Sequence, residues 1–363
     1  MSGRAPVAPV VLPHGECPVG CPYCPPQGTV DSADLLPDPV AVTMAIDQVM
    51  DRRSRQGRPL EPVEIAFFGG DLWALSRELR TALLDVAEWE VRRGRATGIR
   101  LTLSPRSVLR APLQEFKVRG VVAVEVPIHN LSRASHRTLG STHNPRLGLE
   151  AIGRLSRYRL RSVVHLTPGL PRTSHQSALD SAAAVFQAGP SALRLLPALV
   201  LEDTRLAAFY SRGDWQPMTL SEAVLTCQQV LAQARASEVE IVRVGLQPEV
   251  DLLRGPEMIA GPWDEDLRGR VESMRMRKLA TEALTSAFSL GRRAFTFVVH
   301  PREESWLRGW SGANLRALKE QFRLEELKVL PSQEQPAGAL RVYEGALSVV
   351  PPPPKGRGTK RAS

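Results

Sequence analysis

Three cysteines in one short segment are the residues of this sequence best suited to carry chemistry. Cys17, Cys21 and Cys24 follow one another with the spacing C-x3-C-x2-C, shortly after the apolar run Val7–Leu12. Three thiolates on one loop can converge on a single soft metal centre, and the usual occupant of such a loop is an iron–sulfur cluster. A 4Fe–4S cluster normally has four cysteine ligands, so three would leave one iron open. The spacing therefore predicts a cluster at which a reaction can occur.

Other uses of the cysteines stay open at this point. A structural zinc ion needs four ligands, and His14 or His129 would have to supply the fourth. The remaining cysteine, Cys227, lies between Leu225 and Val230 in a periodic apolar pattern. That pattern predicts a buried free thiol on a helix. A disulfide is the least favoured reading of the loop, because the chain does not look like a cysteine-dense secreted scaffold.

Several stretches of the sequence together resemble the radical S-adenosylmethionine (SAM) superfamily, and within it the bacterial relatives of the Elongator catalytic subunit. The cysteine segment is one of them. Another is Phe67-Phe68-Gly69-Gly70, where the superfamily has its glycine pair after a strand. The others are His165–Pro171, Leu193–Val200 with Thr204 and Leu206, and Arg243–Pro248. The resemblance runs from roughly Pro9 to Arg341.

This resemblance implies two cofactors, a 4Fe–4S cluster and SAM. The implied metal ligands are Cys17, Cys21 and Cys24, with SAM chelating the open iron. Gly69 and Gly70 would bind the amino group of SAM, since residues without Cβ let a ligand approach the backbone closely. By itself, a glycine pair after a strand also fits an ordinary turn.

Two further SAM contacts are implied by the resemblance. Tyr23 corresponds to an aromatic residue near the adenine, although simple packing under the loop explains it equally well. Glu125, in Val124-Glu125-Val126, corresponds to an acid at the end of a strand that hydrogen-bonds the ribose hydroxyls. A carboxylate on an otherwise apolar strand is costly unless it is paired or bound, which favours a site role.

Composition is consistent with a globular enzyme. The 363 residues suit one large and one small domain, and 43% hydrophobic with 23% charged residues allows a sizeable core. We expect a cytoplasmic protein, because the sequence has no bilayer-length apolar run and no signal peptide pattern. The formal net charge is +9. Four basic residues and no acid lie in 347–363, a Pro-rich segment expected to be a disordered tail. The basic balance is compatible with RNA as a partner.

Short β-branched runs alternate with longer amphipathic stretches, which predicts an α/β fold with a parallel sheet. The expected strands are Val7–Leu12, Val63–Phe68, Ile99–Leu103, Val121–Val126, Ser162–Leu166, Ala192–Leu196 and Glu238–Val244. The expected helices are Pro39–Arg53, Arg77–Arg93, Arg146–Tyr158, Ser174–Gln187 and Ser221–Ala236, with start signals at Asp38-Pro39 and at Thr219 with Glu222. About six βα units predict a partial, (β/α)6-type TIM-like barrel, in agreement with the superfamily.

Functional groups of such barrels lie after the carboxyl ends of the strands. The cysteine loop follows the first expected strand and Gly69-Gly70 the second. Glu125 is expected to end the fourth, and Pro168-Gly169 follows the fifth. The order of the motifs therefore fits a site at the barrel mouth.

The chain departs from its relatives at three places. They have Gly-Val-Gln-Ser after the acid of the fourth strand, where this chain has Pro127–Asn130. They have Arg-Pro-Asp after the third strand, where this chain has Ser104–Arg106, and a tyrosine common in the sixth-strand stretch is Leu195 here. His129 and Arg106 are candidates for replacements facing the pocket; the alternative for His129 is a solvated loop histidine. Because of these departures, the substrate pocket of the relatives need not be kept in this chain, whereas the cluster is expected to be kept.

The C-terminal part predicts a second module. We expect a strand at Ala294–Val299, a helix at Glu303–Leu307, a further helix from Gly309 to Phe322 and a strand at Leu327–Leu330. The G-x-x-G loop Gly309-Trp310-Ser311-Gly312 between two helices resembles a KH-type nucleic-acid module, with Arg308 and Arg316 flanking it. Trp310 offers a stacking surface in place of a basic residue. The alternative is a small structural cap that binds nothing.

We therefore expect a radical SAM domain at 1–290, a KH-like α+β module at 291–346 and a tail at 347–363. We expect no acetyltransferase domain. The implied activity is reductive cleavage of SAM to methionine and a 5′-deoxyadenosyl radical, which abstracts hydrogen from a substrate, with RNA or tRNA as the candidate. The electron donor would be a protein such as ferredoxin or flavodoxin, and no residue is identified as acid or base. The alternative function is a non-catalytic iron–sulfur RNA-binding or scaffold protein.

Overall fold

The structure is a computed structural model that describes residues 5–12, 37–140, 144–246, 258–287 and 292–350. The chain divides into two compact units, unit 1 (Met1–Glu265) and unit 2 (Asp266–Ser363). Among the described residues, no helix is long and apolar enough to cross a membrane.

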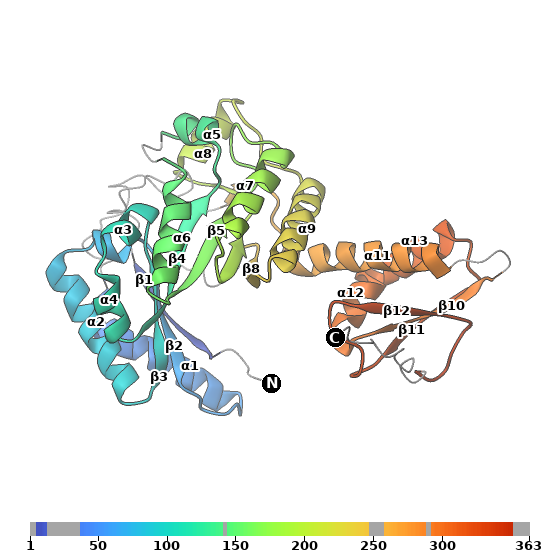
Figure 1. Cartoon of the computed structure of the whole chain (residues 1–363), viewed down its shortest axis with the longest axis horizontal. Helices are drawn as coiled ribbons and strands as arrows, with labels where there is room; N and C mark the ends of the chain where they lie inside the picture. Colours follow the sequence, from blue (N-terminus) through green and yellow to red (C-terminus); the bar gives the residue numbers. More distant parts are fainter. Residues whose placement is uncertain (1–4, 13–36, 141–143, 247–257, 288–291, 351–363) are drawn as a thin grey trace, which may run out of the picture. The chain divides into compact units, whose positions relative to one another are not determined.

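Unit 1 is built around a curled, half-barrel sheet of seven parallel strands in the order β1-β2-β3-β4-β5-β6-β8 (Figure 1). The strands are β1 (Val7–Leu12), β2 (Val63–Gly69), β3 (Ala96–Thr102), β4 (Val121–His129), β5 (Arg161–Leu166), β6 (Ala192–Leu195) and β8 (Glu240–Val244). This confirms the predicted α/β partial barrel and each of the seven expected strands. A second, two-stranded sheet pairs β7 (Val200–Leu201) with β9 (Met258–Ala260).

Helices cover one face of the large sheet because apolar side chains alternate along its strands. In β1, Ala8, Val10 and Leu12 are buried against α1, whereas Val7 and Val11 on the other face are exposed. The helices are α1 (Val40–Arg55), η2 (Leu72–Ala74), α2 (Arg77–Arg92), α3 (Pro105–Arg110), α4 (Leu113–Val118), α5 (Arg133–Thr138), α6 (Leu147–Arg157), α7 (His175–Gln187), α8 (Arg205–Ser211) and α9 (Leu220–Ala236). We call the opposite face of the sheet the inner face.

The residues predicted to start two helices, α1 and α9, do so in the structure. Thr219 and Glu222 form the expected reciprocal capping box at the start of α9. At α1, the Asp38 carboxylate accepts a hydrogen bond of 2.8 Å from the backbone N–H of Val40. The five longer helices of unit 1 that we expected are all present, within two residues of the predicted ends.

The extent of β4 corrects one expectation. The strand continues to His129, so Glu125 lies inside β4 and does not end it. A register shift between Pro127 and His129 bends the end of the strand, and His129 has a φ of 65°. Such bulges let a strand run on while changing the direction of a side chain. Three of the four residues in Pro127–Asn130, one of the departures from the relatives, therefore form the last part of β4.

In its described residues, unit 2 combines three α-helices and two short 3-10 helices with a three-stranded sheet in the order β11-β10-β12 (Figure 1). Its elements are α11 (Leu267–Ala287), β10 (Ala294–Val299), η3 (Pro301–Glu303), α12 (Glu304–Arg308), η4 (Trp310–Gly312), α13 (Ala313–Gln321), β11 (Glu326–Pro331) and β12 (Leu340–Glu344). β10 pairs with β11 in parallel and with β12 antiparallel. The expected strand, helix, helix and strand are present in order, and α11 and β12 join them.

The domain boundary predicted at residue 290 lies later in the chain than the boundary between the two units of the structure. The chain divides at Glu265, before α11, because α11 belongs to the core of unit 2. Met276, Ala280 and Leu284 of α11 are fully buried in one cluster with Phe295 and Phe297 of β10. A long helix that follows a series of βα units looks like one more unit of the barrel until its packing is known.

Candidate functional site

The segment that contains Cys17, Cys21, Cys24 and Tyr23 lies outside the described residues, as do His14 and the end of Arg243–Pro248. The structure describes the strand that leads into this segment. Leu12, the last residue of β1, accepts a hydrogen bond of 3.0 Å from the backbone N–H of Gly70. The glycine pair therefore lies at the point where the chain leaves β1 toward the cysteines.

Asp71 fixes the turn that contains the glycine pair. Its carboxylate is 4% exposed and accepts hydrogen bonds from the N–H of Trp73 at 2.9 Å and of Ser104 at 3.0 Å, and from the hydroxyl of Ser107 at 2.6 Å. Gly69 has a φ of 96°, a backbone conformation that favours glycine. Sequence reasoning missed Asp71, although an acid directly after a glycine pair and before a short helix is a recognisable cap.

Glu125 is the centre of a buried ionic network on the inner face. Its Oε1 accepts from Arg100 at 2.7 Å and lies 3.0 Å from an Nη of Arg194. Its Oε2 lies 2.8 Å from Nε2 of His165. Glu64 extends the network, with Oε2 at 3.0 Å from Arg100. The register of β2 to β6 brings these side chains, which come from five strands, onto one face.

The network keeps Glu125 ionised. Burial acts to raise the pKa of this carboxyl, but the hydrogen bond and charge of His165, with the charges of Arg194 and Arg100, lower it to about 2. A carboxylate that is 2% exposed and held by these donors has little capacity left to accept further hydrogen bonds. Sequence reasoning found Glu125 but missed Arg100 and Arg194, each of which interrupts an apolar strand with a charge.

Two buried polar atoms beside this network lack a hydrogen-bond partner within the described part of the chain. They are Nε of Arg100 and Oγ1 of Thr102. Both residues belong to β3 and lie one pleat apart on the inner face, and Thr102 is paired in register with Glu125. Buried donors of this kind are normally satisfied, so they indicate a place for a polar ligand or for water.

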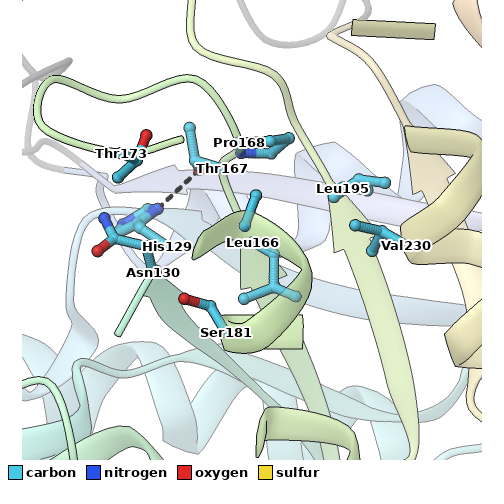
Figure 2. Close-up of a pocket in the computed structure, with 10 residues that line it drawn as sticks. His129, Asn130, Leu166, Thr167, Pro168, Thr173, Ser181, Leu195 and Val230 are labelled. Carbon is cyan, nitrogen blue, oxygen red and sulfur yellow. Dashed lines mark hydrogen bonds between the residues drawn. The ribbon is translucent and has the colours of Figure 1, made fainter. Parts of the chain in front are cut away.

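A small cavity opens at the end of β4 and β5 (Figure 2). Nδ1 of His129 lies 3.0 Å from the hydroxyl of Thr167, and both side chains line the cavity with Asn130 and Leu166 (Figure 2). Burial, followed by the nearby charges of His165 and His136, holds the pKa of His129 well below its usual range. His129 is therefore a neutral cavity-lining residue rather than a solvated loop histidine. Arg106, the other proposed replacement, is half-buried in the first turn of α3.

The remaining cysteine behaves as predicted. Cys227 is fully buried in α9, and burial raises the pKa of its thiol far above the usual range. A buried thiol of this kind is unreactive. Among the described residues, no group of three or more His, Cys, Asp and Glu side chains could hold a metal ion.

Comparisons with known proteins agree with this arrangement. The Radical_SAM C-terminal domain family matches residues 190–277. The curated tRNA uridine(34) acetyltransferase of Dehalococcoides mccartyi (strain CBDB1) is 26% identical over 246 residues, which are 60% of this chain and 53% of that protein. These two matches make the chain similar to radical SAM proteins of the Elongator-like group. The chain spans about half the length of the curated relative it matches.

One solved structure supports the fold described above, and a second is similar over part of the chain. The archaeal Elp3 of Methanocaldococcus infernus, with an N-terminal deletion, superposes with a TM-score of 0.57 at 17% identity, covering 76% of this chain and 64% of that chain. Coproporphyrinogen III oxidase (HemN) of Escherichia coli, a radical SAM enzyme, gives a TM-score of 0.43 at 15% identity, covering 64% of this chain and 53% of the other. The Elp3 likeness agrees with the curled parallel sheet.

Unit 2 carries the G-x-x-G turn between α12 and α13. Gly309 and Gly312 have φ values of 72° and 77°, and Ser311 has a φ of 49°. Trp310 projects from the turn with 76% of its surface exposed. Arg308 pairs with Glu304 at 2.8 Å, and an Nη of Arg316 donates to the carbonyl of Ser311. The structure thus brings together the predicted nucleic-acid residues, with the tryptophan outermost.

Proposed function

We propose that this protein is a radical SAM enzyme that uses a 4Fe–4S cluster bound by Cys17, Cys21 and Cys24, and that it acts on RNA. The observation that carries the proposal is the hydrogen bond between Gly70 N–H and the Leu12 carbonyl. It joins the glycine turn to the strand end from which the chain enters the cysteine segment. The family's two cofactor-binding elements therefore begin at one edge of the sheet.

The described residues of the inner face fit SAM as a ligand. Nε of Arg100 can donate a hydrogen bond, and the hydroxyl of Thr102 can donate or accept one, as the carboxylate and hydroxyl groups of SAM require. Gly69 and Gly70 offer backbone without a side chain. Tyr23 would add an aromatic surface for the adenine. These groups would hold SAM, and the three cysteines would hold the cluster.

The bound cofactors would supply reductive cleavage of SAM and a 5′-deoxyadenosyl radical for hydrogen abstraction. The chain's own residues have other tasks. Glu125, ionised at neutral pH, serves as a fixed negative charge and orients His165 and Arg194. Neutral His129 and Thr167 line the cavity at the end of β4 and β5.

Two observations support RNA as the substrate class. The curated relative is a tRNA uridine(34) acetyltransferase, and tRNA is therefore the first RNA to test. The formal charge of +9 favours a polyanionic partner. We place the reaction in the cytoplasm, where thiols stay reduced, with a ferredoxin or flavodoxin as electron donor.

Anaerobic reconstitution tests the enzyme directly. The purified chain is incubated with iron and sulfide, and then with SAM and dithionite. We expect about four iron atoms per chain and the formation of 5′-deoxyadenosine. The triple variant C17A/C21A/C24A should lose both. The matched control C227A, which removes the buried fourth cysteine, should retain both.

The same experiment distinguishes the proposed enzyme from the alternative, a non-catalytic scaffold. An intact cluster that binds SAM but never yields 5′-deoxyadenosine would indicate a non-catalytic iron–sulfur scaffold. Equal iron content in the triple variant and in C227A would show that the three cysteines are not the ligands, and the proposal would be wrong.

A further inference from the structure

Trp310 is the most exposed tryptophan among the described residues. It is 76% exposed, compared with 53% for Trp89 and 39% for Trp263. Its neighbours in the turn are the small residues Gly309, Ser311 and Gly312. The indole therefore offers an exposed aromatic face on which a nucleic-acid base can stack.

The turn is built to hold Trp310 in place. The side-chain amide of Asn314, at the start of α13, donates to the carbonyl and hydroxyl of Ser273 and to the carbonyl of Trp306, at 3.0 to 3.1 Å. A Cβ on Gly309 would lie 2.9 Å from the backbone nitrogen of Asn314. The turn therefore requires glycine at this position and is tied to α11 and α12. A rigid support lowers the entropy lost when a partner binds.

Unit 2 is more basic than unit 1. It has 18 Lys and Arg against 10 Asp and Glu, a surplus of eight of which four lie in 351–363, whereas unit 1 has 29 against 28. Some of this charge lies at the turn: the Arg270 guanidinium is 5.8 Å from the centre of the Trp310 ring, and the exposed Arg308 and Arg316 flank it on α12 and α13. An aromatic surface with basic neighbours is the usual combination for single-stranded nucleic acid.

We propose that the turn Gly309–Gly312 is a docking surface for single-stranded RNA, in which Trp310 stacks on a base and Arg270, Arg308 and Arg316 contact the flanking phosphates. The choice of RNA rests on the proposed function, while the surface itself does not depend on the cluster. A membrane is disfavoured as the partner, because insertion into lipid needs several apolar side chains and the turn has one. An isolated base needs only one aromatic face.

Binding of the full chain to fluorescent single-stranded RNA 12-mers, by anisotropy, tests the proposal. Stacking on one base contributes enough that W310A should weaken binding by about tenfold or more. W310F, which keeps an aromatic face, should recover most of the affinity. The matched control is W89A, which removes an exposed tryptophan that also lies under an arginine, at 3.7 Å from Arg93, but in unit 1. We expect W89A to bind RNA as the parent does.

Salt dependence tests the phosphate contacts. In R270Q/R316Q the slope of log K against log salt should become smaller by about one to two, since each lost phosphate contact removes close to one released counterion. Circular dichroism of each variant checks that unit 2 is folded. Equal binding by W310A and W89A, or binding to anionic vesicles in place of RNA, would overturn the docking surface.

The test separates this proposal from the proposed function. Formation of 5′-deoxyadenosine without RNA binding that depends on Trp310 would leave the radical SAM enzyme standing and remove the docking surface. Binding that depends on Trp310 in a chain that never cleaves SAM would do the reverse.

Discussion

Nε2 of His165 lies 2.8 Å from Oε2 of Glu125, on two neighbouring strands of the half-barrel. Because Glu125 is ionised at neutral pH, Nε2 carries the proton and donates it to the carboxylate. The other ring nitrogen, Nδ1, is then the one directed away from Glu125. The acid predicted to contact SAM is therefore held by His165 and by the two arginines in this structure.

Replacing Glu125 should strongly destabilise unit 1. In E125Q, Arg100 and Arg194 lose the carboxylate that both contact, and breaking a buried pair in this way costs about 3 kcal/mol or more. E64Q is the matched control, because Glu64 contacts Arg100 only from the more exposed end of the network, with a side chain that is 21% exposed. We expect E64Q to cost less than about 1 kcal/mol in urea denaturation. Equal losses would show that the buried contacts of Glu125 add nothing.

The same network predicts a pH dependence. The pKa of Glu125 is about 2 when folded and 4.5 as its ordinary value, so the folded state binds the proton more weakly. Its stabilising contribution, about 3 kcal/mol, is complete above roughly pH 5 and is lost as the pH falls toward 2. The difference in free energy of unfolding between the parent and E125Q should therefore shrink over this range. A difference that stays constant from pH 6 to pH 3 would contradict the assignment.

Asp71 should matter for the glycine turn. D71A removes a buried acceptor of three hydrogen bonds, and leaves the N–H of Ser104 without its partner. We expect a loss of about 2 kcal/mol in urea denaturation, and weaker SAM binding if the turn holds SAM. D85A is the control, since Asp85 is 63% exposed in its surface pair with Arg119, and its effect should stay within about 0.5 kcal/mol. Similar losses in both variants would mean that the turn does not depend on Asp71.

Gly309 should tolerate substitution worse than another glycine with positive φ in unit 2. G309A and G345A both place alanine at positive φ, at 72° and 88°, which costs about 1 kcal/mol. At Gly345 nothing lies within 4 Å of the new Cβ, whereas at Gly309 the backbone of Asn314 is 2.9 Å away. G309A should therefore lose at least about 1 kcal/mol more. Thermal unfolding followed by circular dichroism measures both, and equal losses would show that the turn can relax.

The strands and long helices of unit 1 could be predicted because their patterns are local. Val63–Phe68 and Val121–Val126 are apolar except for one glutamate each and are rich in β-branched or aromatic residues, and each is a strand. β12 was missed because the five residues Leu340–Glu344 are only partly buried and give a short, weak pattern. The end of β4 was missed because a proline and a histidine after the apolar run, Pro127 and His129, look like a loop in the sequence. Only pairing with β5 keeps them in the sheet.

Some residues of the candidate site could be predicted from the sequence and others could not. Spacing along the chain was enough to find the three cysteines, the glycine pair, Glu125 and the turn around Trp310. It could not show that Arg100 and Arg194 meet Glu125, because these residues come from different strands and only the register of the sheet brings them together.

The sequence by itself determined the succession of strands and helices and the order of the motifs, because both are fixed by periodicity and spacing along the chain. The tertiary structure decided which charges share the inner face, that Glu125 stays ionised among them, that α11 belongs to unit 2 and that Trp310 is exposed. Burial and electrostatic pairing depend on neighbours distant in sequence, and only strand pairing and helix packing choose those neighbours.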